Sequence, residues 1–95
     1  MAVSEPWAPG QIERYRRALE TSWEEFEETY YTTVRRVGLS SMAAQHAKNL
    51  MVRARMKKGM VEGLLARPAR SDETPDTIRQ AVADLVAFKR TLNEL

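Results

Sequence analysis

Cysteine is absent from this chain of 95 residues, and histidine occurs once, as His46. Without cysteine the protein has no disulfide, no thiolate nucleophile and no thiolate metal ligand. Carboxylate-bridged di-metal bundles need Glu-x-x-His pairs on facing helices, and the sequence contains none. No serine combines with a suitably spaced histidine and acid into a nucleophilic set. These absences predict that the protein is not an enzyme and has no catalytic residue, metal site or cofactor.

Long apolar runs are absent as well, because no stretch approaches the roughly 18 residues that span a bilayer. The first ten residues have neither the basic start nor the apolar centre of a secretory signal. The lack of cysteine fits a reducing compartment. We therefore expect a soluble, cytoplasmic protein that does not bind a membrane. Hydrophobic residues make up 43% of the chain and charged residues 29%, which favours one small folded domain over disorder.

Glycine and proline number only four each, and several fall where helices start or stop. Gly38 follows an amphipathic stretch at the position where a left-handed residue closes a helix. Ser40 or Ser41 can then cap the next helix. Thr74 and Pro75 together form a typical helix start. These signals divide most of the chain into three helical stretches.

Apolar residues recur at helical spacing in each stretch, with gaps of three and four residues in the first. The sequence predicts helices over about 11–37, 41–66 and 75–94, and no strand. The short link after the first helix predicts that the second returns antiparallel to it. The predicted fold is therefore all-α, a long antiparallel helical hairpin plus a third, shorter helix. This three-helix bundle leaves room for completion by oligomerisation.

Residues 1–10 are predicted to form an extended arm before a single helical domain over 11–95. Pro6 and Pro9 favour extended backbone. Trp7 lies between them, and tryptophan is enriched at binding hot spots. Two interpretations of Trp7 stay open at this point. It covers one end of the bundle, or it anchors the chain to another subunit.

The second predicted helix is apolar on two sides, which indicates contact with two neighbours. Met42 is expected in the core, and Gly59 is a weak point where the helix could break. The main apolar face contains Leu39, Ala43, Ala47, Leu50, Ala54, Val61, Leu64 and Leu65. A second flank, predicted to contact a second copy or another protein, contains Val52, Met56, Gly59, Met60 and Gly63.

Charge is distributed unevenly, since residues 11–37 carry a net −1 and residues 48–70 a net +6. Clustered Lys and Arg are what nucleic-acid binding requires, because they neutralise phosphates. The basic residues that could make such contacts are Lys48, Arg53, Arg55, Lys57, Lys58, Arg67 and Arg70. No aromatic residues alternate with them, as base stacking would need.

The same basic residues have a structural interpretation, which is pairing with glutamates of the first helix. In an antiparallel hairpin that turns near residue 39, Glu20 lies close to Lys57 and Lys58. Glu24 lies close to Arg53 and Arg55. Exposed ion pairs contribute only about 0–1 kcal/mol each, so these pairs are expected to fix register more than stability.

The leading functional hypothesis is a small non-enzymatic helical interaction protein. It would be an accessory or adaptor subunit that self-associates, giving a homo-oligomer, or binds a larger protein. The alternative hypothesis is a nucleic-acid-binding protein that uses its basic second helix.

Overall fold

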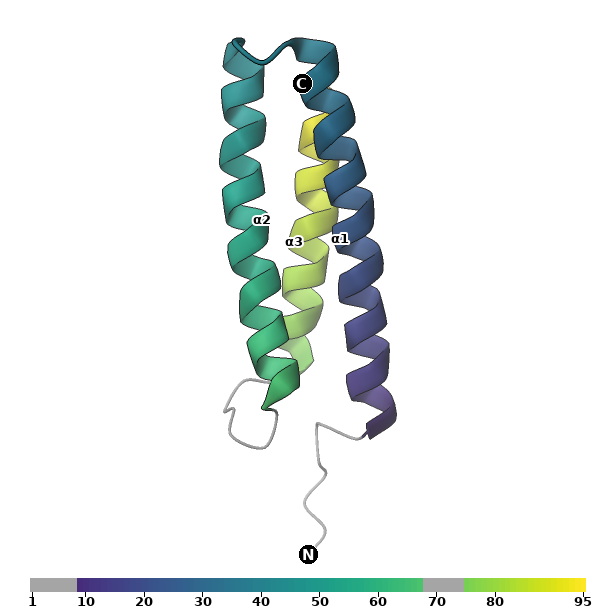
Figure 1. The fold of residues 1–95 in the computed structure, drawn as a ribbon. Coiled ribbons are helices and arrows are strands. Elements are labelled where there is room, and N and C mark those ends of the chain that lie inside the picture. The colour runs from purple at the N-terminus through teal and green to yellow at the C-terminus, as the bar shows by residue number, and fades with distance from the viewer. Residues whose placement is uncertain (1–8, 68–74) are drawn as a thin grey trace, which may run out of the picture.

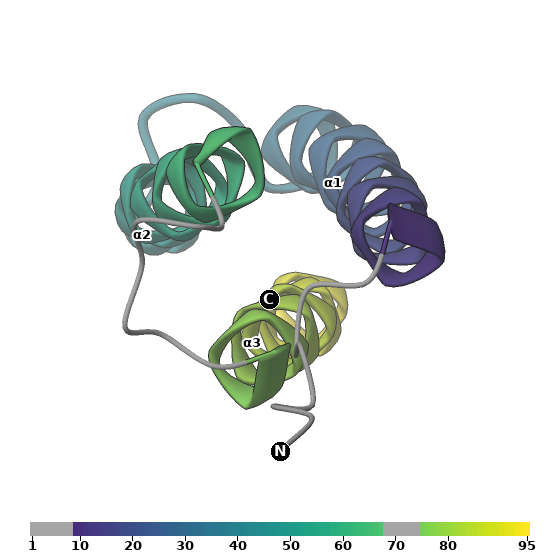
Figure 2. The same ribbon diagram turned by 90° about the horizontal axis from the view of Figure 1, so that it is seen from below.

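The computed structural model describes residues 9–67 and 75–95, which form three helices. They are α1 (Pro9–Val37), α2 (Met42–Ala66) and α3 (Pro75–Glu94). The helices run up, down and up along one another, and they lie at the corners of a triangle when viewed along their axes (Figures 1 and 2). The prediction of an all-α hairpin with a third, shorter helix is confirmed. The predictions for Trp7, Arg70 and the Thr74 cap, and that of an extended arm as far as residue 8, lie outside the described residues.

The turn between α1 and α2 is built from local hydrogen bonds around one glycine. Gly38 has φ +88°, and its amide donates to the Val34 carbonyl at 3.0 Å. The Ser41 hydroxyl donates to the Gly38 carbonyl at 2.9 Å and accepts from the Ala44 amide at 3.0 Å. The predicted stop and the predicted serine cap therefore both form. Ser41 rather than Ser40 is the capping residue.

Two details of the helices differ from the prediction. The first helix begins at Pro9, two residues earlier than expected, because proline is tolerated at the first helical position, where its missing N–H has no intrahelical partner. The second helix is continuous through Gly59. A single glycine weakens a helix by about 1 kcal/mol, which packing of the flanking turns can offset.

The core lies along the central axis, where one stripe from each helix meets the other two. Phe26 of α1 is fully buried, and its ring centroid lies 6.5 Å from that of Phe88 in α3. From α3 the buried residues Ile78, Leu85 and Leu92 complete one wall. The buried residues of α2 are Ala44, Ala47, Leu50, Met51, Ala54, Val61 and Leu65.

The inner face of α2 differs from the predicted one. Leu39 is 72% exposed and Met42 is 89% exposed, so both predictions of core packing are wrong. Leu39 lies in the turn beyond α1, and Met42 is the first helical residue of α2. Ala44 and Met51, which the predicted face omitted, are buried instead.

The end of α3 is held by side chains of α1, which fixes α3 parallel to α1. The Thr33 hydroxyl is buried and donates to the Leu92 carbonyl at 3.3 Å. The Arg36 guanidinium donates to the Leu95 carbonyl at 3.2 Å. The last carbonyls of a helix lack the amide donor four residues further on. Arg36 supplies a donor to the Leu95 carbonyl, and Thr33 supplies a second donor to the Leu92 carbonyl, which also accepts from the Leu95 amide at 3.2 Å.

Gly59 has a helical backbone and Gly38 has a left-handed one, so replacement by alanine is predicted to have opposite effects on stability at these two positions. At Gly59 an added Cβ would meet nothing within 4 Å, so Gly59→Ala should raise the free energy of unfolding by up to about 1 kcal/mol. At Gly38, with φ +88°, Gly38→Ala should lower it by about 1–2 kcal/mol. Urea unfolding followed by circular dichroism at low protein concentration measures both. A loss of stability in Gly59→Ala would contradict an open position.

Candidate interaction surface

The outward side of α2 carries an apolar stripe, which we define as Val52, Met56, Gly59, Met60 and Gly63. The three large side chains are 58%, 70% and 42% exposed for Val52, Met56 and Met60 respectively. Both glycines are exposed, and a Cβ at either would meet nothing within 4 Å. No contact among the described residues therefore requires glycine at these two positions. The predicted flank therefore lies on the surface of the single chain.

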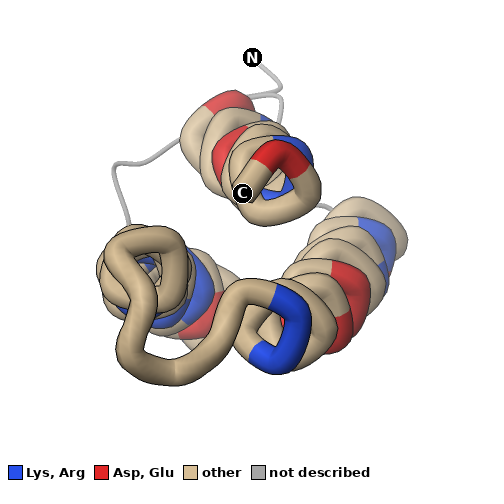
Figure 3. Tube along the Cα trace, turned by 90° about the horizontal axis from the view of Figure 1, so that it is seen from above, with Lys and Arg blue, Asp and Glu red and all other residues tan. Residues whose placement is uncertain are grey.

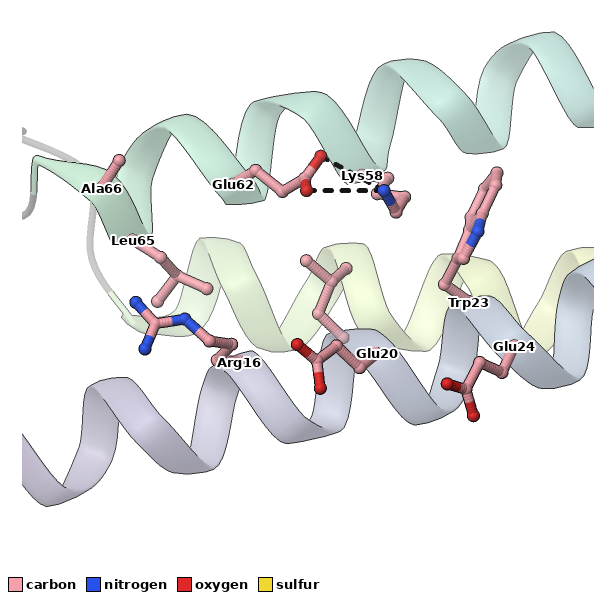
Figure 4. A pocket seen from close by; sticks show the side chains of 9 residues that line it. Arg16, Glu20, Trp23, Glu24, Lys58, Glu62, Leu65 and Ala66 are labelled. Atoms are coloured by element: carbon pink, nitrogen blue, oxygen red, sulfur yellow. Dashed lines mark hydrogen bonds and ion pairs between the residues drawn. The ribbon is translucent and has the colours of Figure 1, made fainter.

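A groove of about 440 Å³ runs between the first half of α1 and the last half of α2. Its floor is apolar and consists of Leu19, Trp23 and Leu65. Figure 4 shows Arg16, Glu20 and Glu24 along the α1 side of the groove, and Lys58 and Glu62 along the α2 side. The groove thus has an apolar base between two charged edges.

Several basic residues predicted to contact nucleic acid are engaged within the chain. Lys57 Nζ lies 3.0 Å from Asp84 Oδ2 of α3. Lys58 Nζ lies 3.4 Å from Glu62 Oε2 on its own helix, and 5.2 Å from the centre of the Trp23 ring. The Arg53 guanidinium lies 4.9 Å from the centre of the Phe88 ring, within the range of a cation–π contact.

These partners show that the predicted ion pairs between α1 and α2 are wrong. Within residues 9–67 no ion pair joins α1 to α2, although Glu20, Glu24 and Lys58 line the same groove. Counting along an antiparallel hairpin gives the height of a residue but not the side of the helix on which it lies. Neighbouring residues are turned by about 100°. Lys57 therefore reaches α3, whereas Lys58 lies over Trp23 of α1.

Among the exposed charges that have no ion pair within the described parts of the chain, one set lies on α1 and another on α2. On α1 they are Glu20, Glu24 and Glu28, which follow one another at intervals of four residues and form the acidic rim, flanked by Arg17 and Arg35, which are exposed and also lack an ion pair among the described residues. On α2 they are Lys48 and Arg55, seven residues apart, which form the basic rim. Figure 3 shows acidic positions along the middle of α1 with basic positions toward both of its ends, and mostly basic positions along α2. Arg67, just past the end of α2, is exposed as well.

The described residues contain no group of three histidine, aspartate or glutamate side chains that could hold a metal ion. His46 is exposed on α2. None of the described helices is both long and apolar enough to cross a membrane. The described surface carries an apolar stripe, a groove and two charged rims.

Comparisons with protein-family models, with curated proteins and with solved structures find no match to this chain. The surface must therefore be interpreted from its own residues.

The Lys57–Asp84 pair joins α2 to α3 and changes the acidity of Asp84. The hydrogen bond from Lys57, and next the one from Gln80, hold the pKa of Asp84 below its ordinary value of 3.8. Because the folded state favours the carboxylate, this interaction stabilises the fold above the ordinary pKa. The stabilisation is lost as the pH falls through the folded-state pKa.

Replacing Lys57 with glutamine should raise the pKa of Asp84 toward 3.8 and lower the stability at neutral pH. The stability difference from the unaltered protein should then disappear once the pH is low enough to protonate Asp84. Carboxyl-carbon NMR titration measures the pKa, and urea unfolding at each pH measures the stability. Lys48→Gln is the matched control, because Lys48 makes no ion pair in the described residues. An unchanged Asp84 pKa in Lys57→Gln would show that the pair does not form.

Proposed function

We propose that this protein is a small non-enzymatic helical subunit that works by binding another protein chain, either a second copy or a larger partner. The surface that binds is the outward side of α2 together with the neighbouring groove. The observation that carries the proposal is the apolar stripe, with Met56 70% exposed beside two glycines at which an added Cβ would meet nothing within 4 Å.

Physical reasons favour a binding role for this stripe. Single exposed apolar side chains are common, but Val52, Met56 and Met60 lie on one side of one helix, which makes a continuous patch. Methionine is unbranched and adapts its shape to irregular partners. Glycines in an exposed helix cost stability, and close approach by another helix would compensate for that cost.

Nucleic-acid binding remains the alternative, supported by exposed Lys48, Arg55 and Arg67 on or next to α2. Against it, Lys57 and Lys58 are engaged in ion pairs and Arg53 packs on Phe88. Fewer free cations are thus available for phosphates than the sequence suggested. An apolar stripe between the cations also favours a protein partner, because phosphates give no reason to expose methionine.

Site-specific photo-crosslinking in the cells that make the protein tests the proposal. A photoreactive residue at Met56 should give an adduct with a protein chain, because the stripe is the contact surface. The same probe at Val86, a 40% exposed position on α3, is the control and should give much less adduct.

The adduct also separates the hypotheses. Protein adducts at Met56, whether with a second copy or with a different chain, support the proposed function. Equal, low yields at positions 56 and 86 would contradict it. Adducts with nucleic acid alone would support the alternative hypothesis of a nucleic-acid-binding protein.

A further inference from the structure

We propose that the partner is a second copy of this chain, bound face to face so that α1 of each copy lies along α2 of the other. This inference rests on the proposed function, because it assigns an occupant to the same surface. It follows from three observations on the α1–α2 face, namely its charges, the heights of its residues and its exposed apolar side chains.

Charge complementarity selects this arrangement. The acidic rim of α1 and the basic rim of α2 both lack ion pairs within the described residues. A two-fold dimer is the commonest way for a chain to bind itself. If the axis crosses the helices at right angles near the level of Phe26, α1 meets α1, and Glu24 of one copy faces Glu28 of the other. If the axis runs parallel to the helices, α1 meets α2 of the partner, and the middle of the acidic rim faces Arg55. The second arrangement is therefore favoured.

The heights of the residues match as well. Rotation about an axis parallel to the helices does not change the position of a residue along that axis. Residues of α1 and α2 that are level within one chain are therefore also level between the two copies. Lys58 lies beside Trp23, with its Nζ 5.2 Å from the ring centre. Because α1 and α2 are antiparallel, three residues back along α2 from Lys58 correspond to three residues forward along α1 from Trp23. Arg55 is therefore level with Phe26. Arg55 of one copy is thus placed between Glu24 and Glu28 of the other.

The exposed apolar side chains and the glycines complete the fit. Tyr31 lies seven residues after Glu24, hence on the same side of α1, and it is 48% exposed. By the same count of heights, Tyr31 of one copy lies close to Val52 of the other, which is 58% exposed. Gly59 and Gly63 leave room for α1 of the partner to approach closely. The same contact with the second copy would cover the apolar floor of the groove.

Charge reversal with mixing tests the arrangement. Sedimentation velocity should give the mass of two chains for the unaltered protein at micromolar concentration. The variant Glu24→Lys with Glu28→Lys, and the separate variant Arg55→Glu, should each weaken self-association by at least about tenfold, because like charges then face each other. An equal mixture of the two should recover dimers. In the mixed dimer the introduced lysines meet the introduced carboxylate, and the second contact keeps its original charges.

Arg90→Glu is the control, since Arg90 is exposed on α3, away from the proposed face, and makes no ion pair among the described residues. It should leave dimerisation unchanged, and circular dichroism should show that all variants remain helical. A monomeric unaltered protein, unaffected reversed variants, or a mixture that stays monomeric would each overturn the second copy as partner. In those cases a Met56 adduct with a different protein would still support the proposed function, so the two failures are distinguishable.

Discussion

The inward side of α2 carries no apolar residue for more than a full turn, between Ala54 and Val61, and the rest of the structure depends on how this gap is covered. Lys57 and Lys58 occupy the gap, and both are half-buried. Their apolar stems can lie along the core, while the ammonium group of Lys57 reaches Asp84 of α3 and that of Lys58 lies over the Trp23 ring of α1 and pairs with Glu62 of α2 itself. Here α2 is joined to its neighbours through lysines, not through large apolar side chains.

The large apolar residues that this part of α2 does contain are therefore turned outward. Met56 and Met60 lie next to the two lysines in sequence, so a rotation of the helix that buried them would expose the lysine stems and break the Lys57–Asp84 pair. The apolar stripe is thus a consequence of how α2 is fixed between α1 and α3.

The fold was predictable because its signals are local. Gly38, the serine cap and Pro75 each specify a helix end through backbone geometry, and the apolar spacing of α1 and α3 specifies one buried face per helix. For α2 the spacing was ambiguous. Alanines mark a buried face weakly, and methionine is found equally well inside and outside, so Met42 was placed inside and Met51 was not assigned.

The candidate surface was predicted in part. The stripe was identified because its residues do not fit on the same side of α2 as the buried ones. The observed partners of Lys57 and Lys58 were not predicted. The side of the helix on which a lysine lies decides which acidic residue it can reach, and counting along the hairpin does not give that side. The exposed groups that have no ion pair among the described residues, Glu24 and Arg55 among them, could be identified only from the pairs that the structure shows.

The central claim is that the α1–α2 face is covered by α1 and α2 of a second copy. Isotope-filtered NMR on a mixture of labelled and unlabelled chains tests it most directly, because it detects only contacts between copies. The account predicts nuclear Overhauser effects from the Val52 methyl groups of the labelled chain to the Tyr31 ring of the unlabelled one. Contacts between copies that involve α3 instead, or no contacts between copies at concentrations where the protein is fully helical, would contradict it.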